Sequence, residues 1–202
     1  MPITGLYNTG VDDSSNALPT GSIDPHYIIS NNPDPGGTPT ALVLPLSNGW
    51  AANDASSAWI GPPTSMVANC WPCSNQGLFT YRLTFSLTGL DPATARIGGQ
   101  WAADDSGATI LLNGVNTGIS YDMPAYGALA AFTINTGFVA GLNVLNFVIS
   151  NSGEGATGML VRNLGGTAEV AAVPIPAALW LLGSGLLVLV TVGRRRVQSR
   201  AP

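Results

Sequence analysis

The sequence is short of the residue types that most often carry catalysis and metal binding. It contains no lysine, one histidine and two cysteines, and only 9% of its residues are charged, where about a quarter is typical. A structural zinc site takes four ligands, mostly Cys and His, and this chain does not supply them. The single histidine, His26, lies in the short apolar segment 26–29, which has the character of a strand, and no Ser–His–Asp arrangement accompanies it.

The few charges are unevenly distributed. Every basic residue is an arginine, and four of the seven lie in the last nine positions. Residues 1–173 hold the other three arginines and all eleven acidic residues, which gives this part a net charge of −8. Such a body repels phosphate backbones, so we expect no nucleic-acid partner. Scarce charge beside 25 glycines and 15 prolines favours a secreted, β-rich protein over a cytosolic enzyme.

A long apolar segment precedes the terminal arginines. Residues 173–192 contain no charged side chain, and three arginines follow almost at once, at positions 194–196. A helix from after Pro176 to about Val192 would be apolar on every face, and it approaches the roughly 20 residues that span a bilayer. We therefore predict a single transmembrane helix, with the arginines on the cytoplasmic side and the preceding residues outside. The alternative is a helix buried inside the body.

The order of Pro-containing motif, apolar helix and arginine cluster resembles the PEP-CTERM class of bacterial sorting signals, in its VPxPA variant. The residues that carry the likeness are Val173, Pro174, Ile175, Pro176 and Ala177, with Arg194, Arg195 and Arg196. The resemblance implies recognition by an exosortase, a membrane protease or transpeptidase, at the inner membrane. It further implies removal of the tail and transfer of the body to the cell surface or extracellular polymer. The Glu of the parent motif is absent, and Ile175 replaces the Leu that is usual in the variant.

These segments predict one body and one tail. We expect a β-sandwich domain over residues 1–165, a linker over 166–172 and the sorting signal over 173–202. The body is long enough for one domain with a sizeable core. Export also needs a secretory signal, and the first eight residues have neither a cationic start nor an apolar stretch. We expect that signal upstream of Met1; if Met1 is the true start, the body would stay in the cytoplasm behind a tail anchor.

Alternating apolar and polar side chains predict strands from Leu78 onward. In the segment 79–87 the side chains that would share one core face are Phe79, Tyr81, Leu83, Phe85 and Leu87. Further strands are expected over 95–102, 109–112, 132–135, 142–150 and 159–163, with shorter ones over 26–29 and 41–44. Asn113-Gly114 predicts a hairpin turn. Many short strands without helical periodicity indicate an antiparallel sandwich.

The body also resembles the galactose-binding-like jelly roll over residues 78–163. The segments that carry the likeness are Trp101–Asp105, Ile110–Gly114, Gly141–Asn151 and Gly158–Leu160. The resemblance implies a β-sandwich whose loops at one end hold a glycan or a structural calcium ion in some relatives.

The two cysteines form the motif Cys70-Trp71-Pro72-Cys73. This spacing suits half a zinc site, a redox pair or a small disulfide loop, and free thiols are a further alternative. Ser74 stands where a haem attachment motif needs His, and Asn75-Gln-Gly77 does not continue as the helix of a thioredoxin-like redox pair. Because oxidation is the default in an exported protein, we predict a structural disulfide between Cys70 and Cys73.

Loop aromatics beside polar side chains are the candidates for contact with polysaccharide. The candidate glycan-binding residues are Trp50, Trp59, Trp71, Tyr121, Tyr126, Asp104, Asn113 and Asp122. Burial against the loops is the competing fate of these aromatics, and we expect Trp101, at the head of a strand, in the core. Asp104 and Asp105 could instead hold a structural Ca²⁺ through their oxygens. The interpretation that we favour for residues 104–107 is a simple hairpin turn.

A hydrolase is a third interpretation. A glycosidase holds two carboxylates about 5 to 10 Å apart, which here would require Asp104 or Asp122 to face Glu154 across a groove. We expect instead a non-enzymatic, exported surface or matrix protein without a cofactor, delivered by its tail, whose sandwich can contact polysaccharide. The alternative function is that of a carbohydrate-binding module of the cell envelope.

Overall fold

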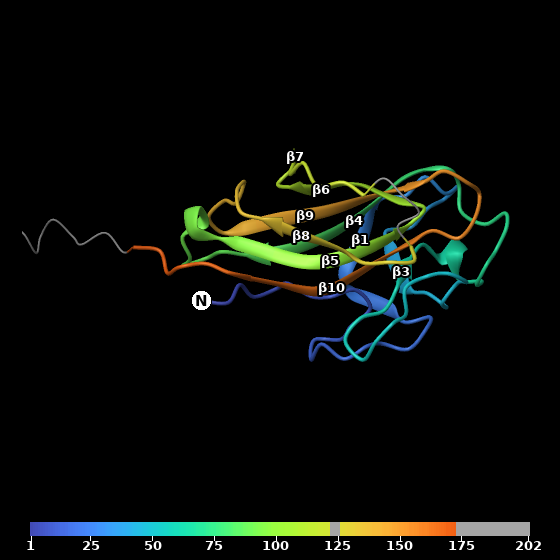
Figure 1. Ribbon diagram of the computed structural model, residues 1–202, viewed down its shortest axis with the longest axis horizontal. Helices are drawn as coiled ribbons and strands as arrows, with labels where there is room; N and C mark the ends of the chain where they lie inside the picture. The colour runs from blue at the N-terminus through green and yellow to red at the C-terminus, as the bar shows by residue number, and fades with distance from the viewer. Residues whose placement is uncertain (122–125, 173–202) are drawn as a thin grey trace, which may run out of the picture. The chain divides into compact units, whose positions relative to one another are not determined.

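Ten antiparallel strands form one continuous sheet in the computed structural model, which describes residues 1–121 and 126–172 (Figure 1). Their order across the sheet is β7-β6-β9-β4-β1-β2-β3-β10-β5-β8. The strands are β1 (Ile23–Asn31), β2 (Thr40–Val43), β3 (Ile60–Gly61), β4 (Gly77–Ser86), β5 (Arg96–Asp104), β6 (Ser106–Leu112), β7 (Val115–Asn116), β8 (Ala130–Ile134), β9 (Leu142–Asn151) and β10 (Gly158–Thr167). Two 3₁₀ helices lie between strands, η1 (Pro63–Ser65) and η2 (Pro92–Thr94).

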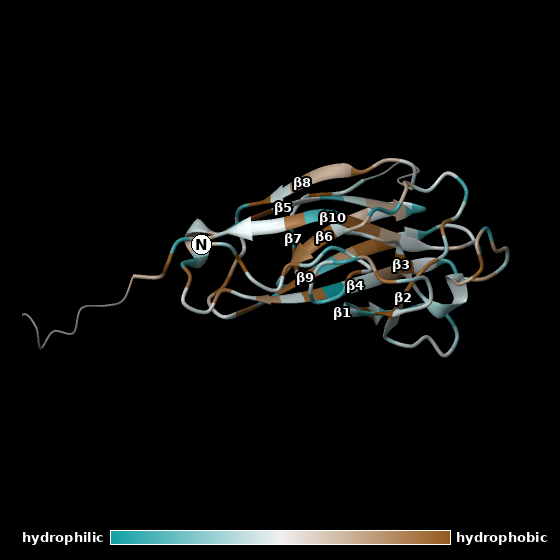
Figure 2. Cartoon of the chain, turned by 90° about the horizontal axis from the view of Figure 1, so that it is seen from below, coloured by the Kyte–Doolittle hydropathy of each residue, from teal (hydrophilic) through white to brown (hydrophobic). Residues whose placement is uncertain are grey.

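The sheet curls over, so that strands far apart in its order face each other across one core. Phe147 on β9 packs against Trp101 on β5 and Phe132 on β8, with 5.8 Å between ring centroids in both pairs. Figure 2 shows β8, β5 and β10 along one side of the body and β4 and β1 along the other. The prediction of a mainly β, antiparallel, jelly-roll-like body is confirmed.

Period-two alternation supplies the core face of β4. The apolar side chains that share this face are at most 2% exposed: Phe79, Tyr81, Leu83, Phe85 and, just beyond the strand, Leu87. β4 pairs with β9 along its whole length, from Gly77 opposite Asn151 to Ser86 opposite Leu142. Each of these large side chains stabilises the fold by roughly 1.5–3 kcal/mol when removed from water, so this strand pair is the centre of the body.

The acidic segment after β5 does not form the expected hairpin turn. β5 pairs with β10 and β8, whereas β6 pairs with β9 and β7. The chain therefore crosses from one side of the core to the other at Asp105, and this crossing places Asp104 and Asp105 at one end of the sheet. The Asn113-Gly114 turn is confirmed: it joins β6 to β7, and both residues have the positive φ that such turns require.

The loop-rich N-terminal part covers the outer face of β5 and β10. Ala102 and Leu160 lie opposite each other on these two strands, and both are buried in a second apolar cluster with Leu44, Trp50 and Trp59. The rings of Trp50 and Trp59 stack with 4.1 Å between their centroids. For these two tryptophans, burial against the loops is the outcome that the structure shows.

The body extends past residue 165. β10 continues to Thr167, and Val170 forms an antiparallel bridge with Leu90, next to η2. Residues Met1–Val170 form one compact unit, so most of the segment 166–172 that the sequence suggests as a linker belongs to it. The predicted transmembrane helix and sorting signal fall within 173–202, outside the described residues. Among residues 1–121 and 126–172, no helix is long and apolar enough to cross a membrane.

Candidate functional site

A cleft opens at the end of the sheet where β5 passes into β6. Its volume is about 330 Å³, near the lower limit of the roughly 300–1,000 Å³ found for small-molecule pockets. Loops around residues 47–50, 69–71 and 153–156 meet the acidic crossing at this cleft. Its wall includes Ser47, Asn48, Trp50, Asn69, Trp71, Asp104, Asp105 and Tyr126.

Trp71 is the most exposed aromatic side chain of this wall. It is 69% exposed, although burial is the usual fate of so large an apolar ring. The Cε3–Cζ3–Cη2 edge of the ring lies close to Gly153 and Gly155: a Cβ atom added to them would stand 3.0 Å and 3.3 Å from its nearest carbon. The two glycines therefore let the ring edge approach the backbone more closely than a larger residue would allow without a shift of the ring, and most of the indole is open to solvent.

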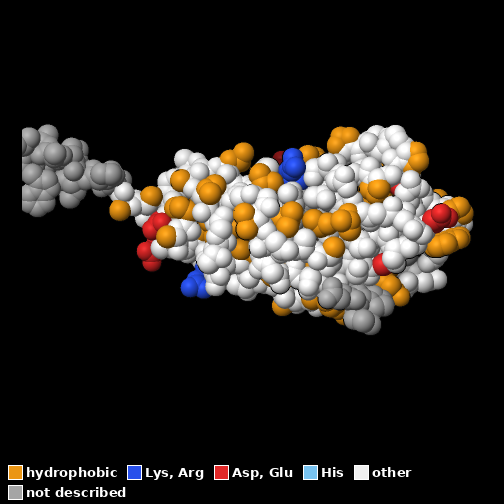
Figure 3. Space-filling view, turned by 90° about the horizontal axis from the view of Figure 1, so that it is seen from above, with side chains coloured by type: hydrophobic (Ala, Val, Ile, Leu, Met, Phe, Trp, Pro, Cys, Tyr) orange, Lys and Arg blue, Asp and Glu red, His pale blue; other side chains and the backbone are white. Residues whose placement is uncertain are grey.

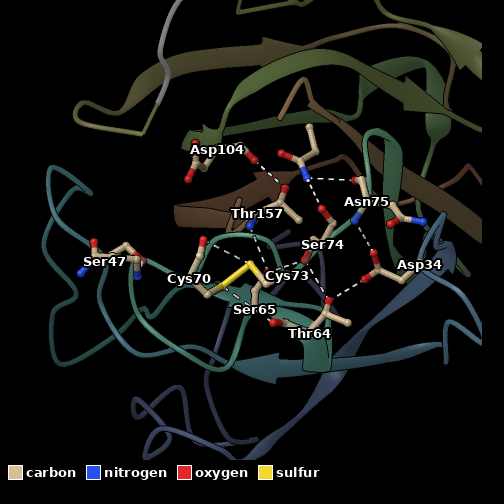
Figure 4. Close-up of a disulfide and its surroundings, with 12 residues drawn as sticks. Asp34, Ser47, Thr64, Ser65, Cys70, Cys73, Ser74, Asn75, Asp104 and Thr157 are labelled. Carbon is tan, nitrogen blue, oxygen red and sulfur yellow. Dashed lines mark hydrogen bonds between the residues drawn. A yellow bond between two sulfur atoms is a disulfide. The ribbon is translucent and has the colours of Figure 1, made fainter. Parts of the chain in front are cut away.

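A disulfide fixes the loop that presents Trp71. Cys70 and Cys73 are bonded, as predicted, with their Cα atoms 5.8 Å apart (Figure 4). The backbone N–H of Cys73 donates to the carbonyl of Glu154 at 2.7 Å, which joins this loop to the glycine loop beneath the indole. On the other side, Asn69 Oδ1 accepts from the N–H of Asn48 at 2.8 Å. The loop that carries Trp71 is thus held by the disulfide and by hydrogen bonds to two neighbouring loops.

A chain of hydroxyl groups beneath the disulfide loop connects it to the sheet (Figure 4). The Ser74 hydroxyl lies 2.8 Å from the hydroxyls of both Thr64 and Ser65. Thr64 donates to the buried carboxylate of Asp34, and Ser65 Oγ accepts from the N–H of Thr157 at 3.0 Å. Asp34, Ser65, Ser74 and Thr157 are buried, and because their polar groups partner one another they give the segment that carries the disulfide loop a single arrangement.

Asp104 lies at the end of β5 and faces the cleft from below. Its Oδ2 accepts from the indole N–H of Trp50 at 2.8 Å, and its carbonyl accepts from the Thr157 hydroxyl at 2.6 Å. Burial raises the pKa of this carboxyl to about 7, the adjacent Asp105 adds to the increase, and the Trp50 hydrogen bond opposes it. Near neutral pH, Asp104 can therefore both accept and donate hydrogen bonds.

The Asp105 side chain points toward the loop 152–155, which contains Gly153 and Gly155. Its Oδ2 accepts from both the N–H and the hydroxyl of Ser152, each at 2.6 Å. Partial burial acts to raise the pKa of Asp105, but the Ser152 hydrogen bonds outweigh it and the pKa is lowered. The two neighbouring carboxyls therefore differ in ionisation, and the ionised one anchors the loop that supports Trp71.

The structure brings together half of the predicted glycan-binding residues. Trp50, Trp71, Tyr126 and Asp104 all line the cleft, although Trp50 is only 7% exposed. Trp101 is 1% exposed and lies in the core as expected.

The other predicted residues lie elsewhere. Trp59 is fully buried in the second apolar cluster, so its ring offers no face to a ligand. Tyr121 is half-buried against the main core. Asn113, at the far end of β6, uses its amide N–H groups on Gly137 and Asn143 to hold the β6–β7 turn. Asp122 lies outside the described residues.

Several residues of the cleft were not identifiable as a group from the sequence. Ser47, Asn48 and Asn69 are ordinary loop residues in composition, and only the fold brings them beside Trp71. Gly153 and Gly155, in the stretch Ser152-Gly-Glu-Gly155, gave a weak signal: two glycines that flank an acidic residue suggest a close approach to something else. That partner, the indole, lies about eighty residues earlier in the chain.

Among the described residues the acidic side chains form no group that could hold a metal ion, and Glu154 does not line the cleft with Asp104. Residues 1–121 and 126–172 contain no group of three or more His, Cys, Asp or Glu side chains that could hold a metal ion. The carboxylates of Asp104 and Asp105 instead bind Trp50 and Ser152. Glu154 is exposed and is not part of the cleft wall, whose glycine loop contributes the two residues on either side of it.

No protein-family model and no curated protein matches this chain. Among solved structures, the chain is similar to a family 35 carbohydrate binding module from an environmental isolate. The sequence identity is 11% and the TM-score is 0.37, over 72% of this chain and 98% of the module. A likeness this distant says nothing about the ligand of this chain, which has to be inferred from the cleft itself.

Proposed function

We propose that this protein is a non-enzymatic, exported surface or matrix protein whose body binds carbohydrate in the Trp71 cleft. The observation that carries the proposal is the Trp71 ring, which is 69% exposed although one of its edges packs against Gly153 and Gly155 and a disulfide closes the loop that carries it. An ordered, flat, apolar surface suits the C–H face of a sugar ring, which buries apolar area on the indole without desolvating its hydroxyls.

The polar groups around Trp71 suit the hydroxyls at the edge of the same sugar. Ser47, Asn48 and Asn69 contribute a hydroxyl and two amides to the wall, and Asp104 and Asp105 contribute carboxyls. A few fixed polar groups beside an apolar surface are the usual composition of a ligand pocket. A site at one loop end is also what the galactose-binding-like jelly roll, which we propose as the fold family of the body, would provide.

Substitution of the indole tests the carbohydrate site. We expect Trp71→Ala to weaken binding to a responsive polysaccharide at least tenfold, about 1.4 kcal/mol, because the platform is lost while the disulfide and the core remain. Affinity electrophoresis against a panel of soluble polysaccharides, followed by titration calorimetry with the oligosaccharide that binds, measures this loss. Leu142→Ala is the matched control, because Leu142 is 66% exposed and lies outside the cleft. Equal weakening by both variants, or binding unaffected by Trp71→Ala, contradicts the proposal.

The C-terminal sequence supports export as the second part of the proposal. Residues 173–177 resemble the recognition motif of an exosortase, and the following apolar segment and arginines suit a single pass across the inner membrane. The disulfide agrees with an oxidising destination. The body would then reach the cell surface or the extracellular polymer, where a polysaccharide ligand is available.

Processing of the tail tests this second part. When the protein carries an N-terminal secretory signal in a host with an exosortase, we expect an extracellular form that lacks the residues after about Pro176. Mass spectrometry of the extracellular fraction identifies its C-terminus. Arg194→Gln, Arg195→Gln and Arg196→Gln together should leave the unprocessed form in the cell. An extracellular protein with an intact tail contradicts the proposal.

A further inference from the structure

The charge of the cleft indicates which class of sugar it takes. We propose that the Trp71 cleft selects sugars that carry hydroxyl or ammonium donors and no acidic group, and that Asp104 and Asp105 exclude uronates and sulfated sugars. This inference rests on the proposed carbohydrate-binding function and adds the ligand's charge to it.

The wall of the cleft holds acidic side chains and no basic ones among the described residues. Asp104 and Asp105 are consecutive at the end of β5, and the other polar side chains of the wall, among them Ser47, Asn48 and Asn69, are uncharged. An anionic group on the sugar would approach this pair inside a partly desolvated cleft, where charges interact more strongly than in bulk water. The repulsion acts on acidic sugars alone, since a neutral sugar has no charge to oppose.

The arginines of the body lie where they cannot neutralise the negative charge of Asp104 and Asp105. Arg162 forms an ion pair with Asp54 at 2.8 Å. Arg82 pairs with Asn146, four residues along β9 from Ser150, whose carbonyl accepts from the Asp105 N–H, so roughly 13 Å separate Arg82 from the pair. Arg96 begins β5 and Asp104 ends it, so eight steps of about 3.3 Å separate them by roughly 26 Å, well beyond the ~8–10 Å over which salt leaves charges unscreened.

Charged side chains are also sparse on the face of the body drawn in Figure 3. The whole of residues 1–173 carries a net charge of −8. Long-range electrostatics therefore act in the same direction as the cleft: they slow the approach of a polyanionic chain and leave that of a neutral one unchanged.

The carboxyls also have hydrogen-bonding capacity for a sugar. An ionised carboxylate accepts at about four lone-pair positions, and the Trp50 indole occupies one of those of Asp104. A sugar hydroxyl or a protonated amine can donate to the remaining positions, whereas a ligand carboxylate or sulfate can only accept. The cleft has a single exposed indole and a volume of about 330 Å³. We therefore expect it to bind about one sugar unit of a polysaccharide chain.

Three classes of oligosaccharide test this selection on the full chain. Neutral oligosaccharides of glucose, galactose or xylose, chitosan oligomers as amino sugars, and oligogalacturonate or sulfated oligosaccharides as acidic sugars are titrated at low salt and pH 7.5. We expect the best neutral or amino sugar to bind at least tenfold more tightly than any acidic one, and the gap to narrow at 0.5 M salt because screening weakens the repulsion.

A charge-removing variant assigns the selection to the two carboxyls. Asp104→Asn with Asp105→Asn should bring the affinity for acidic sugars to within about threefold of that for neutral sugars, since Asn keeps an acceptor for Trp50 and Ser152. The matched control is Asp13→Asn with Glu169→Gln, which removes two charges from exposed positions outside the cleft. In the control variant, neutral or amino sugars should still bind close to tenfold more tightly than acidic sugars.

The outcomes separate this inference from the proposed function. If acidic sugars bind as tightly as neutral ones, and Trp71→Ala abolishes both, carbohydrate binding stands and the charge selection is overturned. If selection persists in the Asn variant and is lost in the control, the two carboxyls are not its origin and the inference is again overturned. If no sugar of any class binds, the proposed function fails and this inference with it.

Discussion

Two tryptophans of this body, Trp101 and Trp71, lie on glycines but in opposite environments. Trp101 on β5 is 1% exposed and its ring covers Gly107 across the core, whereas Trp71 is 69% exposed and covers Gly153 and Gly155 at the rim of a cleft. The first ring is placed by strand alternation and stabilises the fold. The second is placed by a disulfide loop and stabilises little, because most of its area remains in water. The comparison indicates that the fold and the site depend on different residues and can be changed separately.

The largest expected effect on stability is at the glycine under the buried ring. A methyl group at position 107 would overlap the Trp101 side chain, and overpacking of this kind costs about 1–3 kcal/mol. We expect Gly107→Ala to lower the free energy of unfolding by this amount, measured by urea denaturation. Gly165→Ala is the control, since a Cβ there meets nothing within 4 Å. Equal stability of the two variants would show that the Trp101 ring does not pack tightly on Gly107.

Loss of the disulfide should affect both the fold and the site. The bond closes a loop of only four residues, for which chain entropy gives a contribution of about 2 kcal/mol or less. We expect Cys70→Ser with Cys73→Ser to lose at most that much stability and to weaken sugar binding severalfold, because Trp71 is then no longer held in place. Calorimetric titration and urea denaturation on the same sample measure both. Unchanged binding would mean that the loop positions the indole without the disulfide.

The glycine under the exposed ring should alter binding alone. Gly153→Ala places a methyl group 3.0 Å from the Trp71 ring, and the ring can move outward into solvent, so we expect stability to change by less than about 1 kcal/mol. Sugar binding should weaken a few fold because the Trp71 ring is displaced from its position in the cleft. The same Gly165→Ala control should leave both quantities unchanged. A stability loss as large as that of Gly107→Ala would remove the distinction between the two tryptophans.

The last expected effect is a pH dependence of stability from Asp104. Burial raises the pKa of Asp104 from its ordinary 3.8 to about 7, so between these values the folded protein holds a proton that the unfolded chain has lost. Stability should therefore fall as the pH rises from about 4 to about 7. In Asp104→Asn this fall should be smaller; Asp24, whose pKa burial also raises, maintains part of it. Urea midpoints at pH 5 and pH 8 measure the difference, and parallel curves for wild type and variant would contradict it.

The sequence was informative where one local rule decides the outcome. Alternation predicted the core face of β4, and Asn-Gly predicted the β6–β7 turn. The disulfide was predicted from the cysteine spacing together with the expected export. It was less informative where distant segments compete for the same residues. Asp104-Asp105-Ser-Gly107 has the composition of a hairpin turn, but β5 and β6 pair with other strands, and no local pattern records that choice.

The candidate site was partly predictable for the same reason. An exposed and a buried tryptophan look alike in a loop: Trp59 and Trp71 are both surrounded by turn residues, and only the packing of residues 44–59 on Leu160 and Ala102 separates them. The glycine floor under Trp71 joins segments about eighty residues apart. Such a juxtaposition depends on the tertiary fold and has no signature in either segment alone.

The indole N–H resonances of the isotope-labelled protein test the central claim most directly. Each tryptophan gives one such signal, and substitutions such as Trp71→Phe assign them. On titration with a neutral oligosaccharide that binds, the account predicts shifts for Trp71, at the platform, and for Trp50, whose N–H donates to Asp104 in the cleft, while Trp59 and Trp101 stay unchanged in the interior. Saturable shifts that spare Trp71, or binding that moves Trp59 and Trp101 instead, would contradict it.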